Sequence, residues 1–191
     1  MTTTASRPTS TPAVPTTTAP RGQEDVITSV GARRTTAALR IAVGFVFLWA
    51  FLDKTFGLGY STASDAAWIR GGAPSQGFLN FAATGPLKDF FVAIASPASD
   101  VLFMLGMLGV GLAVVLGIGL RVSAVAGSLI MAMMWLAEWP LAAGSSNPVV
   151  DYHVVYALAL VAFALVFAGD TWGLGAWWRQ LPVVQKAGWL R

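Results

Sequence analysis

The chain has 191 residues, of which 55% are apolar and only 11% charged, and its formal net charge is +3. Soluble globular domains carry about 25% charged residues, so this composition excludes an ordinary soluble protein. The basic residues are scattered, with no run longer than Arg33-Arg34, which excludes a basic stripe for nucleic-acid phosphates. The chain has no cysteine, which excludes disulfides and Fe–S clusters, and its one histidine, His153, excludes a haem held by two histidines of one subunit.

Residues 1–34 precede the first apolar segment, and we predict a disordered cytoplasmic tail there. Residues 1–20 contain eight Thr and four Pro. Such a segment has too little apolar surface to offset the entropy lost on ordering. No apolar stretch follows a short charged start, so we do not expect a secretory signal peptide.

Four apolar segments follow, each near the length of about 20 residues that crosses the hydrocarbon core of a bilayer. They lie at about residues 37–58, 97–120, 122–141 and 148–169. A backbone in lipid must satisfy its own hydrogen bonds, so we predict an all-α, multi-pass membrane protein built as an antiparallel bundle of four transmembrane helices. Ser96-Pro97 and Asn147-Pro148 each pair a capping side chain with a proline suited to the first helical position, and they predict two of the helix starts.

The basic residues predict the orientation of the bundle. With the N-terminus in the cytoplasm, nine Lys and Arg residues lie inside and three, namely Lys54, Arg70 and Lys88, lie outside. This asymmetry follows the positive-inside rule. We therefore expect a plasma-membrane protein with both termini in the cytoplasm, and we expect Arg40 and Arg121 to reach the lipid headgroups at the cytoplasmic helix ends.

Two segments lie outside the predicted bundle. Residues 59–96 form a long outer connection in which aromatic residues stand among Gly, Pro and polar residues, and we expect short amphipathic helices there. Residues 171–191 contain four Trp together with basic residues, which indicates an interfacial tail on the cytoplasmic side. Within the second apolar segment, Gly109, Ala113 and Gly117 form a stripe of small residues that favours close helix packing.

Ionisable residues in membrane helices are costly to bury, so each is a functional candidate. An antiparallel bundle brings six of them to its outer end: Asp53, Lys54, Asp100, Glu138, Asp151 and His153. Asp100 and Asp151 lie in first helical turns, where the helix dipole stabilises a carboxylate, so a structural role stays open for both. Glu138 stands between Trp135 and Trp139, where we expect it to be desolvated.

Aromatic residues accompany this group, namely Trp49, Trp135, Trp139, Tyr152 and Tyr156. A quinone headgroup needs apolar walls, hydrogen-bond partners at its carbonyls and groups that move protons. One interpretation is a quinone site. Its proton carriers would be His153, Glu138, Asp53 and Asp151. The residues that hold the ring would be Lys54, Trp49, Trp135, Trp139 and Tyr156. The other interpretation is a polar network that joins the helices. The sequence shows no haem, flavin or metal motif, and we expect the Met residues at 131, 133 and 134 to be packing residues.

Three stretches resemble the DoxX-like family of four-helix membrane proteins. They are Leu39–Leu48 with Asp53-Lys54 beyond it, Gly117–Arg121, and Asn147–His153. The resemblance covers about residues 35–170 and does not extend to the Thr/Pro-rich tail or to the long 59–96 connection. It implies a relative of the small subunit of thiosulfate:quinone oxidoreductase, linked to sulfur or oxidative-stress metabolism. It places functional positions at Arg40, Lys54, Arg121, Asp151 and His153.

Two functions are therefore expected. The first is a quinone-interacting subunit of a membrane redox system, which would bind menaquinone or ubiquinone and work with a soluble or membrane redox partner. The second is a non-enzymatic scaffold that docks partner proteins through residues 59–96 or through the C-terminal Trp residues. In both cases the bilayer is the main partner, nucleic acid is not one, and a homo-oligomer is compatible with the sequence. A small transporter is less favoured, because the four segments show no inverted repeat.

Overall fold

The computed structural model describes residues 21–145 and 147–190, and the fold of these residues is helical, without a β-strand. The disordered tail was predicted over residues 1–34, and residues 1–20 lie outside the described range. The rest of that segment is ordered, with a 3₁₀ turn at Gln23–Asp25 and the first residues of a long helix from Val30. Three helices are long and apolar enough to cross a membrane: α1 (Val30–Phe56), α3 (Pro97–Leu116) and α4 (Leu120–Ala137). A fourth apolar helix, α5 (Tyr152–Leu165), has only 14 residues, fewer than the about 20 that a span requires.

Helix α1 begins earlier than predicted, at Val30 rather than near residue 37. The Ser29 side chain caps it by accepting a hydrogen bond of 3.3 Å from the backbone N–H of Ala32. Arg33 and Arg34, expected in the tail, therefore belong to its first turns. The helix ends at Gly57, whose φ of 62° lies in the left-handed region that a residue without a Cβ adopts readily.

The predicted start of α3 is confirmed, because Ser96 caps the helix and Pro97 is its first residue. Helix α3 ends at Leu116, before the predicted residue 120, and a short turn joins it to α4, with Gly117 at φ 74° and Gly119 at φ 56°. The predicted start of the last helix at Pro148 is wrong. Asn147 instead uses its side-chain oxygen to accept the N–H groups of the two valines that follow Pro148, which makes a local turn. Helix α5 begins at Tyr152, after Asp151.

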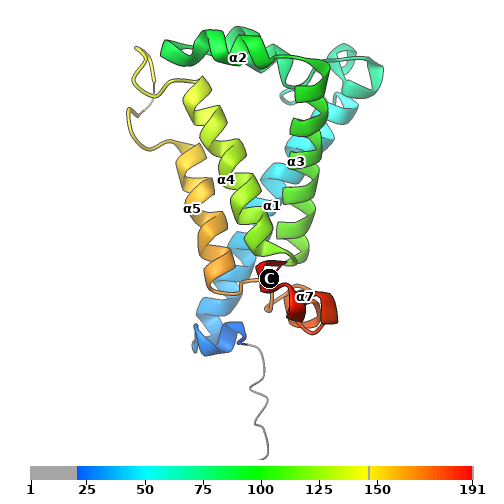
Figure 1. The fold of residues 1–191 in the computed structure, drawn as a ribbon, viewed down its shortest axis with the longest axis vertical. Coiled ribbons are helices and arrows are strands. Elements are labelled where there is room, and N and C mark those ends of the chain that lie inside the picture. The colour runs from blue at the N-terminus through cyan, green and yellow to red at the C-terminus, as the bar shows by residue number, and fades with distance from the viewer. Residues whose placement is uncertain (1–20, 146, 191) are drawn as a thin grey trace, which may run out of the picture.

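The four longer helices pack as two pairs, α1 against α3 and α4 against α5, which share one apolar core (Figure 1). The buried core side chains come from all four helices and include Phe47, Met107, Val114, Met131, Leu160 and Phe163. Two glycines allow α1 and α3 to approach closely. A Cβ at Gly111 would lie 2.7 Å from the backbone N of Leu48, and one at Gly44 would lie 2.8 Å from the backbone N of Val115. Gly109, which belongs to the predicted stripe, faces open space instead.

The outward faces of these helices are apolar. Leu102 on α3, Val125 on α4 and Leu165 on α5 are 74%, 73% and 70% exposed. Side chains of this kind suit hydrocarbon rather than water as their surroundings. The exposed apolar faces agree with the length and composition of the helices, which are those of a membrane protein.

The outer connection folds into short helical turns and the seven-residue helix α2 (Lys88–Ile94), which lies across the upper ends of the long helices in Figure 1. Phe91 of α2 is buried in a small second core with Leu79, Ala83 and Ala137. The backbone N–H of Thr84 donates a hydrogen bond of 2.8 Å to the carbonyl oxygen of Ala137. These contacts fasten the connection to the end of α4.

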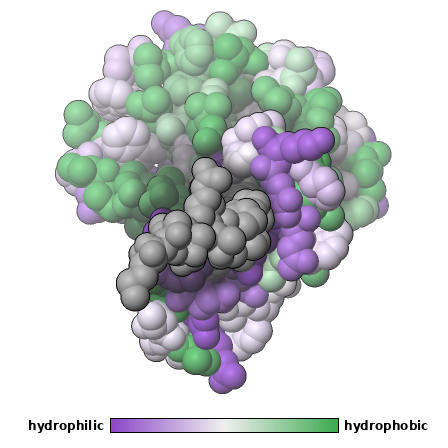
Figure 2. All heavy atoms as spheres, turned by 60° about the horizontal axis from the view of Figure 1, so that its bottom comes forward, coloured by the Kyte–Doolittle hydropathy of each residue, from purple (hydrophilic) through white to green (hydrophobic). Residues whose placement is uncertain are grey.

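The opposite end of the molecule carries both ends of the described chain (Figure 1). Helices α6 (Gly175–Trp178) and α7 (Pro182–Lys186) fold back on it, and Trp178 Nε1 donates to the carbonyl oxygen of Leu190 at 2.7 Å. Arg121 donates to the carbonyl oxygen of Gly188 at 2.9 Å. Figure 2 views this end, where hydrophilic side chains gather, while apolar side chains cover much of the remaining visible surface.

Candidate functional site

The six ionisable residues expected to meet at the outer end are divided among separate arrangements. Glu138, Asp151 and His153 form one cluster, in which one metal-ligating atom of each lies within 4.8 Å of the others. Asp53 and Asp100 each bind a different part of the outer connection. Lys54 is half-buried and forms no ion pair within the described chain.

Asp53 is fully buried near the end of α1 and fixes the turn that follows this helix. Its carboxylate accepts hydrogen bonds from the backbone N–H of Tyr60 at 3.3 Å and of Ser61 at 3.0 Å, and from the Ser61 hydroxyl at 2.7 Å. Both carboxylate oxygens of Asp53 therefore accept hydrogen bonds from the loop that follows α1. These are the contacts of a residue that holds the loop in place, and the proton-carrier role of Asp53 stays a prediction.

Asp100 likewise holds the middle of the outer connection in place by accepting hydrogen bonds from it. It accepts from the backbone N–H and the hydroxyl of Ser75, both at 2.7 Å. It also accepts from the backbone N–H of Gln76 at 3.2 Å and from the Gln76 side-chain amide at 2.6 Å. Asp100 is therefore held by the loop as much as by the helix dipole, and its structural interpretation is favoured.

The cluster forms where α4 ends and α5 begins. Glu138 follows α4 as its C-terminal cap and is accessible from outside, so the expected desolvation of this residue is wrong. Helix α4 ends here, short of the predicted residue 141, because Pro140 disfavours the helical conformation of the residue before it. Asp151 caps α5 by accepting from the backbone N–H groups of His153 and Val154 at 2.9 and 3.4 Å.

His153 lies behind Asp151 and is completely buried. Its Nδ1 is 2.9 Å from Asp151 Oδ2, so a proton on Nδ1 is donated to that carboxylate. Its Nε2 is buried without a hydrogen-bond partner in the part of the chain that the structure describes.

A cavity of about 470 Å³ opens beside the cluster, between the outer connection and the loop from α4 to α5. Its walls come from the outer connection, the end of α4, the α4–α5 loop and the start of α5: Ala82, Thr84, Trp135, Glu138, Pro140, Ala142, Ala143, Gly144, Ser145, Asn147, Asp151 and Tyr152. The volume falls in the range of about 300–1,000 Å³ typical of small-molecule sites. The indole Nε1 of Trp135 is buried and has no hydrogen-bond partner among the described residues.

The structure brings only some of the predicted site residues to this cavity. Glu138, Asp151 and Trp135 line it. His153 does not line the cavity but forms a hydrogen bond with Asp151, which does. Trp49 packs edge-on against Tyr60, with 5.1 Å between ring centroids, and Tyr156 packs between Phe47 and Tyr152. Trp139 lies beside Gly85 of the outer connection. Neither these aromatic residues nor Lys54 and Asp53 are among the lining residues.

The sequence did not indicate three polar lining residues, namely Thr84, Ser145 and Asn147. Thr84 reaches the cavity because the outer connection folds back onto the end of α4, a contact between distant parts of the chain. Asn147 was assigned to a helix start on account of Pro148. Asn followed by Pro is equally typical of a turn, and this was the signal that could have placed Asn147 in a loop.

Arg40 corrects another expectation, because its guanidinium is completely buried and does not reach the headgroups. It donates to backbone carbonyl oxygens where α3 and α5 end: those of Val114, Val115 (2.6 Å) and Ala168 (3.1 Å), and those of Thr171 (3.4 Å) and Trp172 (3.0 Å) beyond them. The last carbonyls of a helix lack partners within the helix, and a guanidinium offers five N–H donors. Arg40 is thus a cap shared by two helices.

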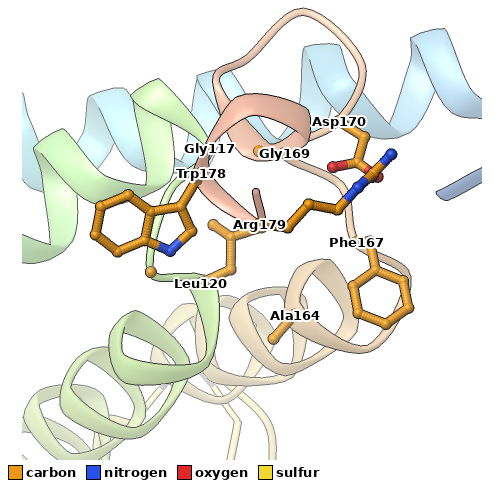
Figure 3. A pocket seen from close by; sticks show the side chains of 10 residues that line it. Gly117, Leu120, Ala164, Phe167, Gly169, Asp170, Trp178 and Arg179 are labelled. Atoms are coloured by element: carbon orange, nitrogen blue, oxygen red, sulfur yellow. The ribbon is translucent and has the colours of Figure 1, made fainter. Parts of the chain in front are cut away.

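A second, much smaller cavity lies near Arg40, at the end of the molecule that carries both ends of the described chain (Figure 3). Its volume is about 20 Å³, which is room for about one water molecule and not for a ligand. Arg179, one of its lining residues, forms an ion pair with Asp170, which also accepts the backbone N–H of Gln23 at 2.9 Å. This end of the molecule is therefore well packed, and the 470 Å³ cavity at the opposite end is the candidate functional site.

Comparison of the chain with models of protein families, with curated proteins and with solved structures gives no match.

Proposed function

We propose that the chain crosses the plasma membrane four times, as an antiparallel bundle of α1, α3, α4 and α5 with both termini in the cytoplasm. The length and apolar character of α1, α3 and α4 support this arrangement. Helix α5 alone is about 21 Å long at 1.5 Å per residue, and apolar residues flank it on both sides, namely Val149, Val150, Val166 and Phe167. These flanks extend its apolar length toward the about 30 Å of the hydrocarbon core.

We propose further that this is a quinone-interacting membrane protein of the DoxX-like kind, acting as a subunit of a redox system. The observation that carries the proposal is the 470 Å³ cavity, whose wall combines aromatic, hydrogen-bonding and carboxylate side chains. Trp135 and Tyr152 provide aromatic surface for the ring, and Thr84 and Asn147 provide donors for its carbonyls.

The carboxylates of the cavity fit the proton chemistry of a quinone. Reduction to the quinol takes up two electrons and two protons. The electrons would come from a soluble or membrane redox partner. Glu138, which lines the cavity and is accessible from outside, is placed to exchange protons with water. His153 positions Asp151 through the 2.9 Å hydrogen bond and does not itself line the cavity.

The proposal is tested by measuring quinone in lipid extracts of the purified full-length protein in nanodiscs by mass spectrometry. We expect about one menaquinone or ubiquinone per wild-type chain, and at least a tenfold lower content in the double variant Trp135→Ala/Tyr152→Ala. Trp49→Ala, which removes an aromatic residue outside the cavity, is the matched control and should keep its quinone. Absence of quinone from the wild type, or an equal content in the double variant, would contradict the proposal.

A second candidate function is a scaffold that docks a partner protein on the outer connection. The specific observation in its favour is the exposure of Ile69, Phe81 and Phe90, at 63%, 88% and 55%, at the outer end of the molecule. Replacing Phe81 and Phe90 with Ser should then abolish capture of the partner while leaving the cavity residues unchanged. The Trp135→Ala/Tyr152→Ala variant should capture the partner normally. The opposite pattern favours the quinone function.

A further inference from the structure

We propose that Glu138, Asp151 and His153 bind one divalent transition-metal ion of the Zn²⁺ or Mn²⁺ class at the edge of the outer cavity. These are one imidazole and two carboxylates, which are ordinary ligands of such ions. The ligating atoms of the three residues already lie within 4.8 Å of one another. Ligands of a tetrahedral zinc ion are about 3.4 Å apart, so small side-chain rotations would complete the set.

The charges around the cluster favour a cation. Two carboxylates, those of Glu138 and Asp151, meet at the ends of α4 and α5. No Lys or Arg of the described chain forms an ion pair with either of them. The neighbouring Tyr152 interacts electrostatically with both carboxylates, and a tyrosine is neutral or, when ionised, negative, so it brings no positive charge. A divalent ion would neutralise this charge without any movement of a basic side chain.

The imidazole already lies beside one of the carboxylates. His153 is completely buried, and its Nδ1 is 2.9 Å from Asp151 Oδ2. Because Nδ1 is the ring nitrogen on the side of this carboxylate, it is the nitrogen that would ligate an ion shared with Asp151 and Glu138. The ion would take the place of the proton that Nδ1 donates to Asp151, since a histidine must lose the proton from the nitrogen that binds a metal.

The surroundings leave room for the rest of the coordination shell. Glu138 and Asp151 both line the 470 Å³ cavity, so positions not taken by the protein would face that space and accept water or another ligand. The ion would also join the last residue of the α4 cap to the first turn of α5 across the intervening loop. Metal binding would therefore stabilise the folded chain at this end.

The test uses full-length protein in nanodiscs, stripped with EDTA and titrated with ZnCl₂ by calorimetry in the absence of added quinone. We expect one Zn²⁺ per wild-type chain, an affinity at least tenfold lower in His153→Gln and in Glu138→Gln, and unchanged affinity in the control Asp65→Asn, which alters an exposed carboxylate elsewhere in the outer connection. A parallel titration with Co²⁺ should give the visible absorption of a nitrogen- and oxygen-ligated ion in the wild type only. Zn²⁺ should raise the Tm of the wild type and not that of the two ligand variants.

Lack of saturable binding to the wild type, or equal affinity in Glu138→Gln, would overturn the proposal. Glu138 is accessible at the end of α4, so Glu138→Gln should leave the fold intact. If His153→Gln fails to fold, the zinc affinity of Glu138→Gln alone decides the test. The proposal does not depend on the quinone function. The ligand variants are read by metal affinity and the aromatic variants by quinone content, so each proposal can fail while the other stands.

Discussion

The guanidinium of Arg40 on α1 donates a hydrogen bond of 3.1 Å to the carbonyl oxygen of Ala168, just beyond the end of α5. The same side chain donates to the carbonyl oxygens of Val114 and Val115 near the end of α3. One buried cation thus joins three helices at the end of the molecule that carries both ends of the described chain. The negative ends of the helix dipoles of α3 and α5 both lie close to it, which stabilises its charge.

Arg40→Lys is expected to destabilise the fold by about 3 kcal/mol, because a lysine keeps the charge but cannot reach the same set of carbonyls and leaves buried acceptors unpaired. Arg34→Lys, on the exposed side of the same helix, is the control and should change the stability by less than about 0.5 kcal/mol. Thermal unfolding in nanodiscs measures both. Equal stability of the two variants would show that Arg40 is not the shared cap.

The close contact of α1 with α3 predicts opposite effects for two nearby glycines. A Cβ at Gly111 would meet the backbone of Leu48 at 2.7 Å and force the helices apart, so Gly111→Ala should destabilise by about 1–3 kcal/mol. A Cβ at Gly109 meets nothing within 4 Å, so Gly109→Ala should be neutral or stabilise by up to about 1 kcal/mol through helix propensity. The thermal midpoints of the two variants test this directly. Destabilisation by Gly109→Ala instead would point to a helix contact along the predicted stripe.

The elements predicted best from the sequence are those whose signals are local. Ser96-Pro97 marks the start of α3, because capping depends on a few adjacent residues. The break between α3 and α4 is predicted about three residues too late, because the left-handed Gly117 ends α3 inside the segment expected to be helical. Asn147-Pro148 carries the same local signal and was wrong, because Asp151 offers a competing cap closer to the apolar residues of α5.

The candidate site was predictable only in outline. The grouping of Glu138, Asp151 and His153 at one end follows from helix direction, which the sequence indicates. Which partners each carboxylate takes does not follow, because Asp53 and Asp100 bind backbone N–H groups of a connection whose path depends on tertiary packing. For the same reason the burial of Arg40 was missed. The carbonyls that surround it come from residues 74 to 132 positions away in the chain.

The second core predicts different behaviour for two adjacent phenylalanines of α2. Phe91 is 2% exposed and packs on Leu79, Ala83 and Ala137, so Phe91→Ala should cost about 3–4 kcal/mol and loosen the outer connection from α4. Phe90 is largely exposed, and Phe90→Ala should change the stability little. Because Ala82 and Thr84 form part of the cavity wall, Phe91→Ala should also lower the quinone content. Hydrogen exchange of residues 78–91 measures the loosening, and protection equal to that of Phe90→Ala would contradict it.

Asp53 provides a last contrast, between a structural carboxylate and one that serves the cavity. Removing its side chain leaves the N–H groups of Tyr60 and Ser61 without their acceptor, so Asp53→Ala should destabilise the protein by about 2 kcal/mol and speed hydrogen exchange in the turn after α1. The exposed Asp65→Ala is the control. Because Asp53 does not line the cavity, the folded fraction of Asp53→Ala should keep its full quinone content. A stable Asp53→Ala protein that has lost its quinone would contradict this prediction. It would show that Asp53 belongs to the quinone site and that the ring binds closer to α1 than the 470 Å³ cavity does.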